Sequence, residues 1–435
     1  MSHEFTLWFV GAWFAIALFL GQAVATCLFG AGLVGVYLWA GPRVLHGLVG
    51  QDIFFTASTY SLSIVPLYLL MAQALLKGNV IVDLFRIGRR LAGPRRLPLG
   101  VATILTGGML GAVSGSGSAS AASLAVLTGP ELEKSGYTKV FAVGLAAIGG
   151  SLSAIIPPSI IVIIYGSMTL VPIGALFIAS IGPAILCILV FIFCLWAFPD
   201  IRPEARGSDA TVIEDEPIGP GTIISFLFVL FLMFVVFGSI YGGIVTVGEA
   251  GAMGAFAALT GMLAMRRIGL RDIHAALTES AKVTAMLVLL VIAAQVFSRF
   301  LSFSQLPRTI LSAAEPMIDQ PLMLVAVLML VIFIAGMILE SIAVIILLIP
   351  IVQPMLEAAQ VDMLWFGILA SFMITLGLLT PPVGLSTYAA ASVSNVPVAK
   401  VFRPTTLFAF IAAVTVAATM LLWPPLVTWL PAHIR

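Results

Sequence analysis

The sequence predicts an all-α polytopic membrane protein made of two inverted repeats, and three observations lead to that fold class. Hydrophobic residues make up 61% of the 435 residues and charged residues only 9%, whereas soluble globular chains are roughly 45–50% apolar and 25% charged. Apolar segments of spanning length recur along the whole chain. Corresponding motifs also reappear in the second half of the chain, which indicates an internal duplication.

The composition excludes soluble enzymes and nucleic-acid-binding proteins. The 20 Lys and Arg and the 19 Asp and Glu residues leave a formal net charge of +1, so no excess of positive charge is available to attract nucleic acid. Cys27, Cys187 and Cys194 lie in apolar segments without the paired spacing of metal ligands or of a disulfide framework. All four histidines fall in predicted loops or termini. We therefore expect no enzyme activity and no cofactor besides a coupling ion.

Roughly 17–25 apolar residues are needed for a helix to cross a bilayer, and this length predicts about ten full spans plus two re-entrant helical hairpins. The first predicted repeat, 1–198, contains scaffold spans within 5–76, a hairpin at 98–129, a broken helix at 139–170 and a span at 176–198. A polar linker rich in Pro, Gly, Asp and Glu follows at 199–221. The second predicted repeat, 222–435, contains scaffold spans within 222–300, a hairpin at 322–353, a broken helix at 363–395 and a span at 405–429.

Basic residues predict how the two repeats are oriented, because short cytoplasmic loops collect Lys and Arg. The loop after the third span carries a basic cluster, whereas the corresponding loop at 301–321 carries Arg308 together with Glu315 and Asp319. Equivalent loops are therefore expected on opposite sides of the bilayer, which makes the repeats inverted and places both termini on the periplasmic side. The cluster consists of Lys77, Arg86, Arg89, Arg90, Arg95 and Arg96.

The first predicted hairpin is interrupted at membrane depth by small polar residues, Ser114 to Ser118. Backbone groups that leave a helix at this depth are tolerated only where protein or a water-filled cavity satisfies them. Gly115 and Gly117 permit tight turning, and the hydroxyls and freed carbonyls are the hard oxygen ligands that a small cation such as sodium requires. We predict a sodium or substrate site at this tip; helix packing by small residues is the alternative.

Two predicted spans are interrupted at tandem prolines, Pro157-Pro158 and Pro381-Pro382, which lie 224 residues apart. Tandem proline removes two amide donors and clashes with the preceding turn, so the helix breaks there. The free carbonyls at one half-helix end are suited to a cation and the free amides at the other to an anion. Such paired breaks are typical of transporters with discontinuous helices, and a simple kink is the alternative.

Glu340 lies at the predicted tip of the second hairpin. A carboxylate at membrane depth is costly unless it is paired, protonated or coordinated. We therefore predict a functional role for this residue. The alternative is that the tip reaches the external surface and that Glu340 is solvated there.

Four segments, in this order, resemble the large membrane subunit of tripartite ATP-independent periplasmic (TRAP) transporters. They are SGSGSASAASLAVLTGPELEKSGY, FAVGLAAIGGSLSAIIPPSIIVIIYG, GMILESIAVIILLIPIVQPML and FGILASFMITLGLLTPPVGLSTYAAA. The resemblance covers essentially the whole chain. It implies a sodium-coupled secondary importer of organic acids, such as dicarboxylates or sialic acid, in the bacterial inner membrane. It also implies an elevator-type fold, in which the hairpins and broken helices form a mobile transport domain.

The same resemblance implies which residues form the binding sites. The first sodium site would consist of Ser114, Gly115, Ser116, Gly117, Ser118, Gly150, Ser151 and Pro157. The second would consist of Gly336, Glu340, Ser341, Thr375, Thr380 and Pro381. The substrate is expected between the two tips, on Ser116, Ser118, Ser159, Glu340 and Gly384.

The resemblance further implies two protein partners, a periplasmic substrate-binding protein and a small four-helix membrane subunit. Only four residues precede the first apolar segment, so we expect the small subunit to be a separate chain. The main alternative is a divalent-anion or tricarboxylate carrier, which shares inverted repeats and broken hairpins but not this Pro-Pro spacing. An ion channel would also use re-entrant loops rich in Gly and Ser.

Overall fold

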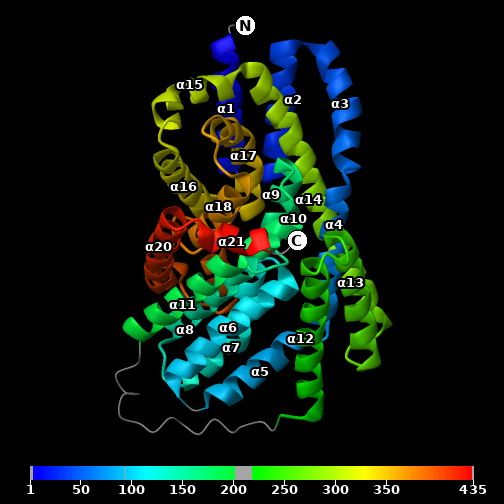
Figure 1. The fold of residues 1–435 in the computed structure, drawn as a ribbon, viewed down its shortest axis with the longest axis vertical. Coiled ribbons are helices and arrows are strands. Elements are labelled where there is room, and N and C mark those ends of the chain that lie inside the picture. Colours follow the sequence, from blue (N-terminus) through cyan, green and yellow to red (C-terminus); the bar gives the residue numbers. More distant parts are fainter. Residues whose placement is uncertain (1–2, 94, 201–217, 434–435) are drawn as a thin grey trace.

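The computed structural model describes residues 3–93, 95–200 and 218–433, which form an elongated bundle of helices (Figure 1). Within these residues every regular element is a helix. Nine helical segments of the described residues are long and apolar enough to cross a membrane, and four shorter apolar helices accompany them. The predicted fold class, an all-α polytopic membrane protein, is confirmed.

The first half of the chain contains the first hairpin, α6 and α7, and the first Pro-Pro break, which separates α8 from α9. In order, its elements are α1 (His3–Phe19), α2 (Val24–Ala40), α3 (Pro42–Ala57), the 3-10 turn η1 (Tyr60–Ser63), α4 (Ile64–Lys77), α5 (Val80–Ala92), α6 (Arg96–Ser114), α7 (Gly117–Lys134), α8 (Lys139–Ser151), the 3-10 turn η2 (Leu152–Ala154), α9 (Ile160–Thr169), α10 (Ile173–Ala179) and α11 (Ile181–Ala197).

The second half repeats this order, with the hairpin α16 and α17 and a break between α18 and α19. The second helix of each hairpin has 18 residues, and both Pro-Pro peptide bonds are cis. The elements are α12 (Pro220–Tyr241), α13 (Val247–Ala264), α14 (Leu270–Ser304), α15 (Leu306–Ile318), α16 (Pro321–Ile338), α17 (Ser341–Ala358), α18 (Met363–Gly377), α19 (Leu385–Val393), α20 (Val398–Leu422) and α21 (Pro425–His433).

Helix bounds differ from the predicted spans where helical structure continues past the apolar stretch. α14 begins at Leu270, before the apolar residues at 283–300, and Asp272 in its first turn accepts a hydrogen bond from the Gly269 N–H at 2.8 Å. Such a carboxylate stabilises a helix start in polar surroundings.

Most of the predicted linker at 199–221 lies outside the described residues. The boundaries of the two repeats and their inverted orientation stay predictions.

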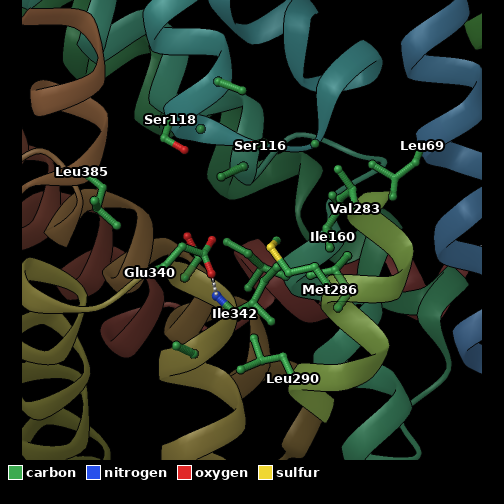
Figure 2. Close-up of a pocket in the computed structure, with 18 of the residues that line it drawn as sticks. Leu69, Ser116, Ser118, Ile160, Val283, Met286, Leu290, Glu340, Ile342 and Leu385 are labelled. Atoms are coloured by element: carbon green, nitrogen blue, oxygen red, sulfur yellow. Dashed lines mark hydrogen bonds between the residues drawn. The ribbon is translucent and has the colours of Figure 1, made fainter. Parts of the chain in front are cut away.

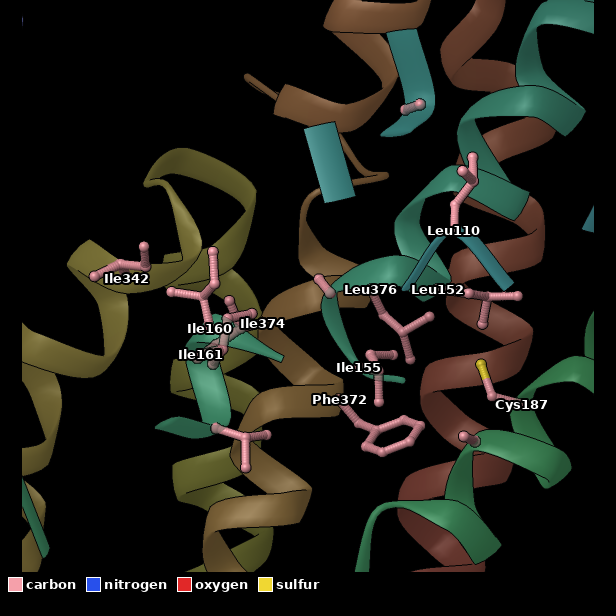
Figure 3. Close-up of a cluster of buried hydrophobic side chains, with 14 of the residues drawn as sticks. Leu110, Leu152, Ile155, Ile160, Ile161, Cys187, Ile342, Phe372, Ile374 and Leu376 are labelled. Carbon is pink, nitrogen blue, oxygen red and sulfur yellow. The ribbon is translucent and has the colours of Figure 1, made fainter. Parts of the chain in front are cut away.

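The two halves of the chain interlock through their broken helices. α9 of the first half packs against α17 and α18 of the second, and α19 of the second half packs against α7 and α8 of the first. In Figure 3, Ile160 and Ile161 of α9 lie close to Ile374 of α18 and face Ile342 of α17, and all four residues are buried. The hairpins and broken helices therefore share one core. We call α6–α9 together with α16–α19 the hairpin block.

A second group of helices packs around α14. α14 contacts α2, α3 and α4, and α13 also packs against α4. We call α2–α4, α13 and α14 the scaffold helices. Beside their contacts with one another, they meet the hairpin block where α4 packs against α6 and where α14 packs against α17.

Ion pairs join α5 both to the scaffold helices and to the first hairpin. In the first turn of α5, Asp83 Oδ2 lies 2.6 Å from Nη1 of Arg267, which follows α13. Nη2 of Arg267 also donates to the carbonyl oxygen of Gly221 in α12 at 2.9 Å. In the last turn of α5, Arg89 Nη1 lies 2.8 Å from Glu131 Oε2 of α7. α5 is thus a charged connection between the two groups of helices.

Candidate functional site

A cavity of about 440 Å³ lies where the two hairpin tips meet the scaffold helices (Figure 2). The close-up places Ser116 and Ser118 of the first tip and Glu340 of the second on different sides of this cavity, with Met286 of α14 also lining it. The tips contribute Gly115, Ser116, Gly117, Ser118 and Ala119 from the first hairpin and Glu340, Ser341, Ile342 and Ala343 from the second.

The first tip is a sharp two-residue turn between α6 and α7. Gly115 has a left-handed backbone, with φ 61°, and its N–H donates to the Gly111 carbonyl oxygen at 3.3 Å. A Cβ atom at Gly115 would come within 3.0 Å of the Pro158 carbonyl oxygen. Only glycine combines this conformation with such a close approach. The tip therefore lies directly against the first Pro-Pro break.

The residue after Gly115 tightens the contact between the first tip and the break. The carbonyl oxygen of Ser116 accepts a hydrogen bond from Ser153 Oγ at 2.9 Å. Ser116 is also the N-cap residue of α7, with an extended backbone, and it is half-buried in the cavity wall. One hydroxyl of the break thus fixes the tip while the Ser116 and Ser118 side chains line the cavity.

The second tip differs because its N-cap residue is a carboxylate. Glu340 Oε2 accepts a hydrogen bond from the Ile342 N–H of α17 at 3.0 Å (Figure 2). A carboxylate at a helix N-terminus interacts favourably with the free amides and with the helix dipole. Glu340 nevertheless remains exposed to the cavity. The structure therefore supplies a partner for this charge without removing it from the cavity.

The second break is fastened to the end of α16. The N–H groups of Val383 and Gly384 donate to the Met337 carbonyl oxygen at 3.1 and 3.2 Å. Thr375 Oγ1 donates to the Ser371 carbonyl oxygen at 2.8 Å, and both threonines of the predicted site, Thr375 and Thr380, are buried. The backbone at this break thus holds the second tip in place, as a side-chain hydroxyl does at the first.

The structure divides the predicted site residues into two layers. Gly115, Ser116, Gly117, Ser118, Glu340 and Ser341 line the cavity. The others pack behind the tips, in the breaks and in the helices beside them; they are Gly150, Ser151, Pro157, Ser159, Gly336, Thr375, Thr380, Pro381 and Gly384. The side chain of Ser114 lies outside the described residues. The sodium- and substrate-binding roles of all these residues stay predictions.

Hydrogen bonding and packing account for several residues of the second layer. Ser159 is fully buried; its hydroxyl donates to the Ala154 carbonyl oxygen and accepts from the Val162 N–H, which caps α9. A Cβ atom at Gly150 would lie 2.4 Å from the Ala121 Cα atom. This glycine therefore lets α8 approach α7 closely.

The scaffold side of the cavity was not found by sequence reasoning. Gln73 of α4 is the one polar side chain that the scaffold helices contribute to the described lining, and no described lining residue is a Lys, Arg or His. The available signal was a single amide within the apolar run 69–76. The scaffold residues of the lining are Leu69, Ala72, Gln73 and Leu76 of α4, Val24 and Ala25 of α2, and Val283, Met286, Leu287 and Leu290 of α14.

Comparison with known proteins gives one consistent result. A family model described as "Tripartite ATP-independent periplasmic transporter, DctM component" matches residues 11–425. The C4-dicarboxylate TRAP transporter large permease protein DctM of Pseudomonas aeruginosa is 29% identical over 381 residues, which cover 87% of this chain and 86% of that protein. The ectoine TRAP transporter large permease protein TeaC of Halomonas elongata is 29% identical over 420 residues, which cover 95% and 96%.

A solved structure supports the fold independently. The Alcanivorax borkumensis YdaH transporter, whose crystal structure is described as having an unusual topology, superposes on this chain with a TM-score of 0.65 and covers 90% of both chains. Its sequence identity is 14%, so the likeness concerns the fold alone.

Proposed function

We propose that this chain, which belongs to the DctM component family of the tripartite ATP-independent periplasmic (TRAP) transporters, couples the import of organic acids to sodium entry. It is a multi-pass protein of the bacterial inner membrane. Relatives carry the names of large permeases for C4-dicarboxylate, 2,3-diketo-L-gulonate and sialic acid. An organic acid of this kind is the substrate class that we assign to the chain.

The observation that carries the proposal is that both hairpin tips line one cavity and bring a carboxylate to it. Glu340 is exposed there, and the described lining provides no basic side chain. The carboxylate of an organic acid entering this cavity would be repelled by Glu340 in surroundings of low dielectric constant. A sodium ion bound at the tips offsets that repulsion, so acid and sodium bind better together than separately. This coupling is what a symporter requires.

The oxygen atoms near the tips support sodium as the ion. Hydroxyls of Ser116, Ser118 and Ser341 stand at the tips, and backbone carbonyls are released from helices at both Pro-Pro breaks. Hard oxygen ligands of this kind suit a hard monovalent cation. We assign the two sodium ions to the two tips with their adjoining breaks, and the substrate to the cavity between them.

The interlocked hairpin block supports an elevator-type motion. Because α9 and α19 each pack into the opposite half, the two tips are held by one core and move as a unit. The scaffold helices would then stay fixed while the block carries the cavity across the membrane. A periplasmic binding protein delivers the acid, and a small four-helix membrane subunit completes the tripartite system.

The test is uptake by proteoliposomes that contain the chain with its two partners. Radiolabelled C4-dicarboxylate, sialic acid and 2,3-diketo-L-gulonate serve as candidate substrates, each with its loaded binding protein outside. One acid should accumulate under an inward sodium gradient, and accumulation should stop when choline replaces sodium.

Three results would contradict parts of the proposal. Full uptake driven by a proton gradient in sodium-free buffer would exclude sodium coupling. Rapid uptake by the chain alone, without either partner, would favour the divalent-anion or tricarboxylate type of carrier, and rates that never saturate would favour a channel.

A further inference from the structure

A second cavity, of about 780 Å³, lies away from the hairpin tips, where α8 begins, α11 ends and α20 begins. The polar residues of its described lining are Thr138, Asp200, Lys400 and Arg403. From its position, its charge and the apolar surface beside it, we infer that this cavity binds the headgroup of an anionic phospholipid. The inference concerns a site separate from the transport cavity and does not depend on the transported acid.

The cavity lies at the level where membrane spans end. The span Ile173–Ala197 finishes beside it and the span Val398–Leu422 begins beside it. Trp196 and Phe198 at the end of α11 are 64% and 46% exposed. Exposed aromatic residues at a span end mark the level of the lipid headgroups. A ligand in this cavity therefore sits where phospholipid headgroups are present at high concentration.

The charges around the cavity favour an anion. Lys400 and Arg403 are both exposed and belong to the first turns of α20, whose N-terminus has no acidic residue and no side-chain cap. The positive end of the helix dipole adds to these two charges. Asp200, the one carboxylate among the described lining residues, accepts a hydrogen bond from Thr138 Oγ1 at 2.9 Å. Among the described residues, neither basic side chain has an ion-pair partner.

An apolar stripe distinguishes a lipid from a soluble anion. Arg403, Leu407, Phe410 and Val414 follow one face of α20, because they are spaced by three or four residues. Leu407 is 40% exposed and also lines the cavity, and Phe410 and Val414 are more exposed still. The stripe leads from the basic residues along the span. It gives an acyl chain a surface directly below its headgroup, which inorganic phosphate would not use.

Lipid at this site would be attached to the hairpin block, because α20 packs against α8 and α18.

The direct test is lipid retention. The full chain is purified from membranes, exchanged into detergent with equal amounts of phosphatidylglycerol and phosphatidylethanolamine, and analysed by native mass spectrometry. The wild-type chain should retain phosphatidylglycerol preferentially.

Variants locate the binding site. The double variant Lys400→Gln, Arg403→Gln should bind phosphatidylglycerol about 30-fold more weakly, from the attraction of two basic residues for an anionic headgroup. Leu407→Gln keeps both charges and should also weaken retention. Because it changes a different residue, it tests the site independently of any folding defect in the double variant. Lys282→Gln, which removes an exposed positive charge on α14, should leave retention unchanged.

Three results would overturn the inference. The wild-type chain could show no preference for phosphatidylglycerol, or the double variant could retain it as well as the wild type does. Millimolar inorganic phosphate could displace the lipid completely while Leu407→Gln has no effect, which would make the site one for soluble anions. An unchanged thermal midpoint of the variants excludes loss of folding as the cause of weaker retention.

Discussion

At corresponding positions the first tip carries Ser116 and the second carries Glu340, and each residue is the N-cap of the second helix of its hairpin. The backbone around them is alike: two helices meet at a short turn that is fastened to a Pro-Pro break. The side chains are not alike, since the first tip carries a hydroxyl group and the second a carboxyl group. Duplicated geometry has thus been combined with two different electrostatic environments in one cavity.

The two breaks differ in the same way. The first is held by the Ser153 hydroxyl, and both of its prolines are buried. The second is held by two backbone amides, and Pro382 is exposed. Because the geometry repeats while the chemistry differs, the two proposed sodium sites need not have the same affinity. We expect the second, anionic tip to bind its ion more tightly.

The largest effect should follow from removing the charge of the second tip. Glu340→Gln keeps an oxygen that caps α17 but removes the carboxylate, so sodium-driven uptake should fall about 10- to 100-fold, the range for losing a charged interaction. Glu340→Asp should recover part of it. Ser116→Ala at the corresponding position should cost only a few-fold. The rates come from initial uptake at several sodium concentrations, and equal losses in both variants would show that the tips are equivalent.

A smaller effect is expected from the close packing behind the first tip. Gly150→Val would force α8 away from Ala121 and should destabilise the fold by about 1–3 kcal/mol, as overpacking does. Ile374 occupies the corresponding, fully buried position in the second half. Ile374→Val should cost only about 0.5–1.5 kcal/mol. Thermal unfolding in detergent measures both, and an unchanged midpoint for Gly150→Val would disprove the packing explanation.

The smallest effect concerns the scaffold side of the cavity. Gln73→Ala removes one neutral hydrogen-bonding group and should raise the KM for the acid about 5-fold, with little change in the maximal rate. Gln22→Ala is the control, because Gln22 lines a different groove, between α1 and α2. A KM that is unchanged in both variants would show that the Gln73 side chain does not contribute to substrate binding.

Much of this architecture could be predicted from the sequence, because its signals are local. Long apolar segments indicate spans, tandem prolines break helices, and the run from Ser114 to Ser118 marks a tip. The apolar residues that the scaffold helices contribute to the cavity could not be predicted from the sequence, because Leu69 and Met286 resemble any lipid-facing or core residue. Likewise nothing local shows that Gly150 packs against Ala121 or that Ser159 caps α9; those contacts arise only when the helices pack together.

The central claim is that the cavity between the two tips binds acid and sodium together. In a chain with Cys27, Cys187 and Cys194 replaced by Ala, Ser118→Cys places one thiol in that cavity. Leu170→Cys, at an exposed position after α9, is the control. The rate of maleimide labelling is measured in proteoliposomes with sodium alone, acid alone and both. We expect protection of Ser118→Cys only when both are present. Equal labelling in all three conditions, in a variant that still transports, would contradict the claim.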